Sequence, residues 1–147
     1  MSTRRTAAAM LAATLAAALL PWGAASAQNL DLARPHKLVL QVSDADPAKW
    51  NLALNNARNV WTDLGRDQVA IEIVAYGPGI NMLKMDSVVG SRVAEAMAAG
   101  MSVVACGNTM KNQKLTREDM LPNLGYVEAG VVQIMKRQRE GFAYVRP

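Results

Sequence analysis

Strand-like and helix-like segments alternate along most of this chain, and this alternation restricts its possible folds more than any other feature. Short apolar segments, several rich in β-branched residues, predict strands at residues 37–43, 68–76, 101–106, 126–127 and 142–145. Longer segments with apolar residues at helical spacing lie between most of them. Two parallel strands that follow each other in the chain need a long connection between them, usually a helix. The pattern therefore predicts an α/β fold with a parallel sheet and helices on both faces.

Capping residues mark where the predicted helices begin and end. Asp46 followed by Pro47 is a typical helix start, and Gly65 is a typical end. Asp86 is expected to cap the next helix, which ends at Gly100, and Thr116 with Asp119 resembles a capping box. The last helix is expected over residues 129–140. The spacing of its residues predicts that one side faces the protein interior, with Val131, Val132, Ile134 and Met135. The other side is predicted to face outward, with Lys136, Arg137 and Arg139.

The N-terminus has the three parts of a secretory signal peptide, which we predict over residues 1–27. Arg4 and Arg5 precede an apolar stretch over residues 7–20, and small residues at Ala25 and Ala27 suit a signal peptidase, with cleavage before Gln28. An uncleaved anchor is the alternative, although the stretch is short for a membrane span. The sequence therefore predicts a periplasmic or secreted protein with a flexible leader at 28–36 and one domain at 37–147.

Signal cleavage changes the charge of the chain. The sequence has 16 Lys and Arg against 12 Asp and Glu, and the predicted signal holds two of the arginines and no acid. The mature chain is thus close to neutral, and we expect no nucleic-acid partner and, after cleavage, no membrane partner.

Cys106 is the only cysteine, so the chain cannot form an internal disulfide. It follows an apolar strand, and a helix beginning near Asn108 would direct backbone N–H groups toward the sulfur. Such donors favour the thiolate, which is the nucleophilic form. The opposing interpretation is a small core residue at a strand end, because free cysteine is among the most buried residue types.

Sites in open parallel sheets form beyond the carboxyl ends of the strands. Three predicted loops meet this condition: one after residue 43, one after residue 76 and one after Cys106. Their candidate ligand-binding residues are Asp44, Asp46, Gly77, Pro78, Gly79, Gly107, Asn108 and Thr109. The last three are expected to form a turn.

Other candidates for chemistry are weaker. His36 precedes the first strand and is expected at the sheet edge opposite Cys106, as a surface residue. The methionines could suit copper in an exported protein. However, their spacing follows the apolar helix faces, so we expect core packing for Met82, Met85, Met97, Met101, Met110, Met120 and Met135. No zinc or calcium ligand set and no phosphate-binding glycine motif is present, and no cofactor or metal is expected.

Four segments resemble one known family in their order along the chain. The segment over residues 104–110, around Cys106, looks like the cysteine motif of DsrE-like proteins. Residues 46–57, the turn at 75–79 and the ending at 138–147 resemble the same group. The likeness covers nearly the whole mature chain.

This resemblance implies a three-layer α/β/α sandwich with a mostly parallel sheet of about five strands, assembled as a trimer or hexamer. In characterised branches of the family the cysteine carries sulfur as a persulfide between partner proteins, a role that falls on Cys106 here. It implies a sulfur donor or acceptor protein as partner, and possible sulfurtransferase-like activity. The alternative is a non-catalytic oligomeric module that binds a small ligand or a protein, with Cys106 structural.

For an assembly surface the candidates are Trp50, Trp61 and residues 80–89, although both tryptophans share the apolar helix stripe and are expected in the core.

Overall fold

The computed structural model describes residues 30–147, and the predicted signal peptide at 1–27 lies outside the described residues. The chain forms a sheet of five strands in the order β4-β3-β2-β1-β5, and every neighbouring pair is parallel. The strands are β1 (His36–Val42), β2 (Val69–Ala75), β3 (Ser102–Cys106), β4 (Gly125–Val127) and β5 (Ala143–Val145). The predicted α/β fold with a parallel sheet is therefore confirmed.

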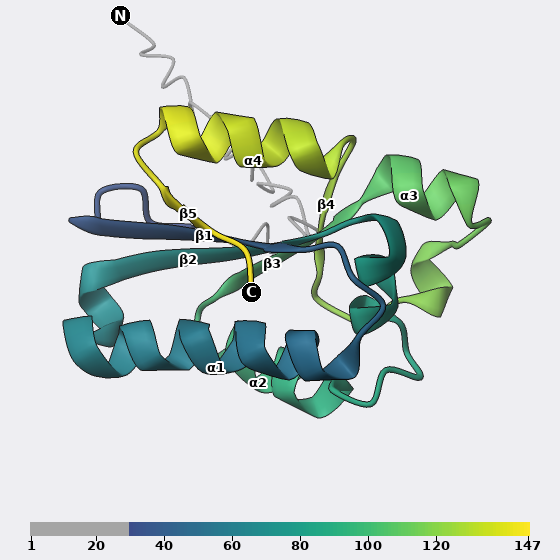
Figure 1. Cartoon of the computed structure of the whole chain (residues 1–147), viewed down its shortest axis with the longest axis horizontal. Helices are drawn as coiled ribbons and strands as arrows, with labels where there is room; N and C mark the ends of the chain where they lie inside the picture. The colour runs from purple at the N-terminus through teal and green to yellow at the C-terminus, as the bar shows by residue number, and fades with distance from the viewer. Residues whose placement is uncertain (1–29) are drawn as a thin grey trace, which may run out of the picture.

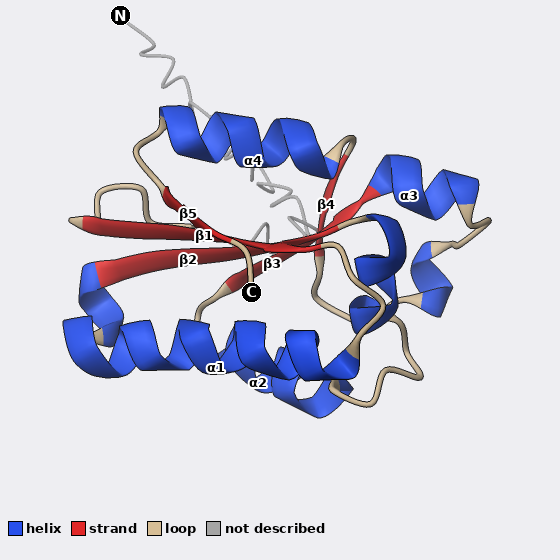
Figure 2. Cartoon of the chain, viewed as in Figure 1, coloured by secondary structure: helices blue, strands red, loops and turns tan. Residues whose placement is uncertain are grey.

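Helices cover both faces of this sheet (Figure 1). One face carries α1 (Pro47–Leu64) and α2 (Gly90–Ala98), and the other carries α4 (Gly130–Arg139). A short helix, α3 (Gly107–Asn112), follows β3 directly, and three 3-10 turns occupy loops at Arg66–Gln68, Gly77–Leu83 and Arg117–Asp119. Figure 2 shows the resulting helix–sheet–helix layers, so the three-layer sandwich is also confirmed.

The larger core lies between the sheet and α1 with α2. Alternate strand residues such as Leu40 and Ile73 enter it, because side chains on a strand point to opposite faces in turn. Trp50 and Trp61 belong to this core, as expected from their helical spacing. Met82, Met101, Met110 and Met120 are buried as predicted, whereas Met85 and Met135 are exposed.

Helix α1 begins and ends as the sequence predicts. The Asp46 carboxylate accepts the N–H of Ala48 at 2.8 Å, and Pro47 is the first helical residue. Gly65 ends the helix at a φ of 90°, a conformation that favours glycine. The capping box of Thr116 and Asp119 is also present. The Asp86 prediction is wrong: α2 begins only at Gly90, and Asp86 instead pairs with Lys84.

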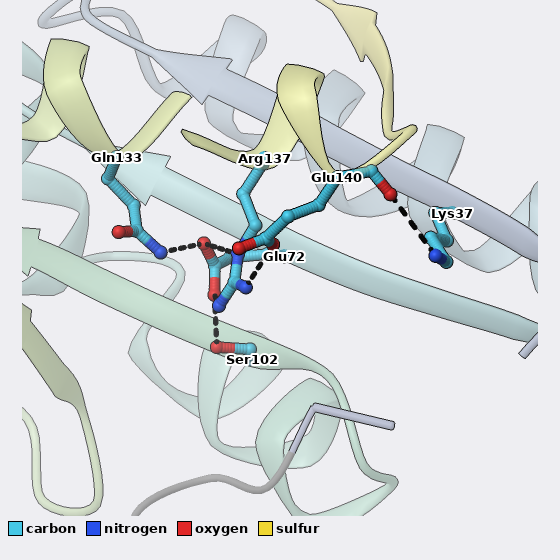
Figure 3. A network of polar contacts seen from close by, with 6 residues as sticks. All are labelled: Lys37, Glu72, Ser102, Gln133, Arg137 and Glu140. Atoms are coloured by element: carbon cyan, nitrogen blue, oxygen red, sulfur yellow. Dashed lines mark hydrogen bonds and ion pairs between the residues drawn. The ribbon is translucent and has the colours of Figure 1, made fainter. Parts of the chain in front are cut away.

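Helix α4 contradicts its prediction most clearly. Only Gly130 and Ile134 are buried on it, while Val131, Val132 and Met135 are 54%, 44% and 48% exposed. Arg137, expected outward, lies against the sheet and pairs with the carboxylate of Glu72 at 2.9 Å (Figure 3). The sheet face beneath α4 carries this buried acid, so the inward stripe of α4 includes a cation instead of a continuous run of apolar residues.

The Glu72 carboxylate is the centre of a buried polar network. It is 1% exposed and accepts hydrogen bonds from Ser102 at 3.0 Å, from Gln133 at 2.7 Å and from two nitrogens of Arg137 at 2.9 Å each. Figure 3 shows these side chains converging from β2, β3 and α4. The network attaches α4 to the sheet in one fixed position.

Candidate functional site

All five strands end at the same edge of the sheet, because every pair is parallel. The loops that follow them therefore meet there, which is where sites form in open parallel sheets. Cys106 is the last residue of β3 and stands at this edge, while exposed His36 begins β1 at the opposite edge, as predicted.

Residues 107–109 form the first turn of α3 instead of the predicted turn. This helix start brings backbone donors to the sulfur of Cys106. The Thr109 N–H donates to Cys106 Sγ at 3.5 Å, so Cys106 itself occupies the capping position of α3. The thiol in turn approaches the carbonyl oxygen of Glu128 at 3.9 Å.

The hydrogen-bond donors around Cys106 determine whether its side chain favours the thiol or the thiolate. Burial of the thiol raises its pKa, because the side chain is only 5% exposed and the anion loses solvation. Hydrogen bonds from the Thr109 hydroxyl and from the backbone N–H groups of Thr109, Gly130 and Asn108 oppose this effect and outweigh it, so the pKa of Cys106 lies below its ordinary value. The site therefore favours a thiolate, the reactive form of cysteine.

Thr109 connects two of the loops at this edge. Its Oγ1 accepts the N–H of Gly77 at 2.9 Å, which leaves the hydroxyl hydrogen free to be donated to the sulfur. Gln113 donates to the carbonyl of Gly77 at 3.3 Å. The loop after β2 and the helix after β3 therefore hold each other in place beside Cys106.

Glycines allow the loop backbones to approach closely. A Cβ on Gly79 would lie 2.2 Å from the carbonyl oxygen of Val42, so only glycine fits between the ends of β1 and β2. A Cβ on Gly107 would lie 3.2 Å from the carbonyl oxygen of Val127. Gly77, Gly79 and Gly107 thus shape the site by their backbones, while Pro78 is exposed.

The two predicted carboxylates do not reach the sulfur. Asp46 is used as the cap of α1. Asp44 forms ion pairs with Lys49 and Arg146 at 3.3 Å each, and Lys49 followed by Arg146 holds its pKa below its usual range against the opposing effect of desolvation. The structure places both at the same sheet edge as Cys106 but in contact with other partners.

Sequence reasoning missed the contribution of the segment that runs from the end of β4 into the start of α4. Gly130 and Glu128 supply a donor and an acceptor to Cys106 through their backbones, and no side-chain type signals this. Tyr76 was also missed. Burial raises the pKa of Tyr76, as do the neighbouring Tyr144 and, to a smaller extent, Cys106, while Arg146 lowers it. Its position directly after β2 was an available signal.

A cavity of about 530 Å³ lies on the α4 side of this edge. Its lining includes Asn108, Glu128 and Ala129, which lie near Cys106 in the chain or in space, and Val132 and Gln133 of α4. Its size suits a small ligand. Cys106 does not line it directly.

Within residues 30–147, no cluster of His, Cys, Asp and Glu has the composition of a metal site. Over the same residues no helix is long and apolar enough to cross a membrane.

Fold and site together define an α/β protein with a hydrogen-bonded cysteine at the carboxyl edge of a parallel sheet. A solved structure of the protein of unknown function MTH1491 from Methanobacterium thermoautotrophicum is similar to this chain, with 36% sequence identity and a TM-score of 0.73, over 76% of this chain and 99% of that one. At this identity and coverage, the chain belongs to the same family as MTH1491. No family model and no curated protein matches it.

Replacing Thr109 with Val tests the origin of the lowered thiol pKa. Removal of the hydroxyl donor moves the pH midpoint of Cys106 alkylation by iodoacetamide upward, because the thiolate loses one hydrogen bond. Below the midpoint we expect the alkylation rate to fall about tenfold, the effect of one charge-assisted hydrogen bond. Thr62→Val, which removes an exposed hydroxyl on α1, is the matched control and leaves the profile unchanged. Identical pH profiles for Thr109→Val and the unmodified protein would refute this assignment.

Proposed function

We propose that this protein carries sulfane sulfur as a persulfide on Cys106. The observation that carries the proposal is the set of donors from Thr109, Asn108 and Gly130, which favours the thiolate at the carboxyl edge of the sheet. The likeness of residues 104–110 to the cysteine motif of DsrE-like proteins supports the same role.

The proposed step uses only the thiolate and a sulfane donor. Cys106 Sγ attacks the outer sulfur of thiosulfate, the sulfur–sulfur bond of thiosulfate breaks, and sulfite leaves with the bonding electron pair. Cys106 then holds a persulfide anion, and charge is conserved. An acceptor thiolate that attacks the outer sulfur regenerates the Cys106 thiolate. The donors around Sγ stabilise its negative charge both before the attack and after the transfer.

We also propose that the protein is exported. The support is the signal-like arrangement of residues 1–27, with small residues at Ala25 and Ala27. In a periplasmic or secreted setting Cys106 is a lone thiol in an oxidising compartment, so its donor and acceptor differ from those of cytoplasmic sulfur relays.

Sulfur loading gives the test of the proposed function. The purified protein is incubated with thiosulfate or polysulfide and its intact mass is measured. We expect an addition of one sulfur atom per chain, removed by dithiothreitol and absent in Cys106→Ser. No addition, or equal addition in Cys106→Ser, would overturn the proposal.

The burial of Cys106 favours a second candidate function. Its side chain is 5% exposed, which suits a packing role in a non-catalytic module that binds a small ligand or a protein. A structural thiol of this kind reacts with iodoacetamide only when the domain unfolds. A carrier thiol reacts under conditions in which the fold stays intact, and comparing alkylation with unfolding rates separates the two functions.

We propose further that the protein forms a homo-oligomer. The support is the exposed apolar surface of α4, formed by Val131, Val132 and Met135, together with the trimers or hexamers implied by the family resemblance. Sedimentation equilibrium is expected to give a multiple of the monomer mass. Val132→Lys is expected to lower that mass, because it places a charge in the apolar surface. A monomer at all concentrations would contradict this proposal.

A further inference from the structure

A second cavity lies far from Cys106, in the groove between α1 and α2. Its volume is about 310 Å³. It is bordered by Trp61, near the end of α1, by Arg66 before β2 and by Met101 before β3. These positions put it at the amino edge of the sheet, opposite the edge that holds Cys106.

Three guanidinium groups surround this cavity, those of Arg58, Arg66 and Arg92. Among residues 30–147, none of the three has a carboxylate within ion-pair distance. Glu95 is the single acid in the lining, so the cavity keeps an excess of positive charge. Unpaired arginines around a concave site favour an anionic ligand.

Arg92 is held in place without being neutralised. Its guanidinium donates to the side-chain oxygen of Asn51 and, at 2.7 Å, to that of Asn55, both on α1. Neutral amide oxygens orient the group and leave its charge available. A cation fixed in this way loses little conformational entropy when it binds an anion.

The remaining lining is apolar. Leu54, Ala96, Ala99 and Met101 contribute to it, and the guanidinium of Arg66 stacks over the ring of Trp61 at 4.9 Å. The indole N–H of Trp61 is buried and has no acceptor among the described residues. An apolar surface with a positive rim matches a ligand that has an apolar body and an anionic group.

We propose that the groove between α1 and α2 binds a small organic anion, a carboxylate or sulfonate on a compact apolar body. The anionic group lies among Arg58, Arg66 and Arg92, and the apolar body lies against Trp61 and Met101. The site is separate from Cys106 and does not depend on the function proposed for it.

Naphthalene-1-sulfonate is a suitable probe, and uncharged 1-naphthalenemethanol is its matched control. Both are titrated into the ¹⁵N-labelled protein and followed by NMR. We expect saturable binding of the sulfonate that shifts the indole N–H signal of Trp61, and at least tenfold weaker binding of the alcohol. Equal affinity for the two compounds, or shifts that do not include Trp61, would overturn the proposal.

Three cavity variants and one control separate loss of binding from damage to the fold. Arg58→Gln, at an exposed residue with no side-chain partner in the described part of the chain, and Arg92→Gln are each expected to weaken sulfonate binding about tenfold. Glu95→Gln removes the one repulsive charge and is expected to strengthen binding severalfold, which a damaged fold would not do. Cys106→Ser is expected to bind as the unmodified protein does. Unchanged affinity in all three cavity variants contradicts the proposed site.

Discussion

Replacing Glu72 with Gln is expected to lower the free energy of unfolding by about 3 kcal/mol, the cost of leaving one partner of a buried ion pair uncompensated. The glutamine keeps the size of the side chain but removes its charge. Arg137 then remains against the sheet with only the partly exposed carboxylate of Glu140 as its partner, and one acceptor oxygen is lost from the network with Ser102 and Gln133. Urea denaturation followed by far-ultraviolet circular dichroism measures the effect.

Two further variants serve as controls for this prediction. Glu140 also pairs with Arg137, at 2.7 Å, but it is 41% exposed, and Glu140→Gln is expected to cost less than about 1 kcal/mol. The double variant Glu72→Met with Arg137→Met is expected to recover much of the lost stability, because removal of both charges leaves neither uncompensated. If Glu72→Gln unfolds at the same urea concentration as the unmodified protein, the network does not stabilise the attachment of α4.

Gly79→Ala is expected to destabilise the fold by about 3 kcal/mol, an overpacking effect. The added Cβ would lie 2.2 Å from the carbonyl oxygen of Val42, 2.6 Å from its carbonyl carbon and 2.8 Å from the nitrogen of Ser43. All three atoms belong to the backbone at the end of β1, so no side-chain rotation can relieve the contact. The ends of β1 and β2 must separate instead.

Gly90→Ala is the matched control for Gly79→Ala. Its Cβ would meet only the two terminal methyls of Leu121, at 3.3 and 3.9 Å, and alanine favours the helix that Gly90 begins. We expect its stability to stay within about 0.5 kcal/mol of the unmodified protein. Equal stability of Gly79→Ala and Gly90→Ala would show that the loop after β2 tolerates displacement.

The parallel sheet and the faces of α4 show what sequence patterns can and cannot predict here. The alternation of strands and helices was sufficient to predict a parallel sheet. Each helix can carry the chain back across one face of the sheet, so that the next strand runs in the same direction as the one before it. The inward side of α4 was predicted from apolar residues alone and was correct for Ile134 but wrong for Val131, Val132 and Met135. A signal was nevertheless present: Glu72 interrupts an apolar strand, and a buried carboxylate needs a cationic partner from the element packed over it.

The candidate site, like the fold, was only partly predictable from the sequence. Cys106 and the loops after β1, β2 and β3 follow from the rule that sites form at the carboxyl edge of the sheet. The donors that adjust the ionisation of Cys106 come mostly from backbone N–H groups, including that of Gly130. The donors of Asn108 and Thr109 were predicted from a helix beginning near Asn108, whereas the N–H of Gly130 carries no residue-type signal and is identified only by the folded geometry. Asp46 was predicted both as a candidate ligand and as the cap of α1, and its carboxylate does cap that helix.

The central claim is that Cys106 carries sulfur in the cell, and the intact mass of the protein from its native compartment tests it most directly. The protein is isolated from the exported fraction of cells supplied with sulfane sulfur, with thiols trapped by alkylation at lysis. The proposal predicts a chain that begins at Gln28, with a fraction heavier by one sulfur atom that disappears on reduction. A chain found only with an unmodified or singly alkylated Cys106 thiol would contradict it.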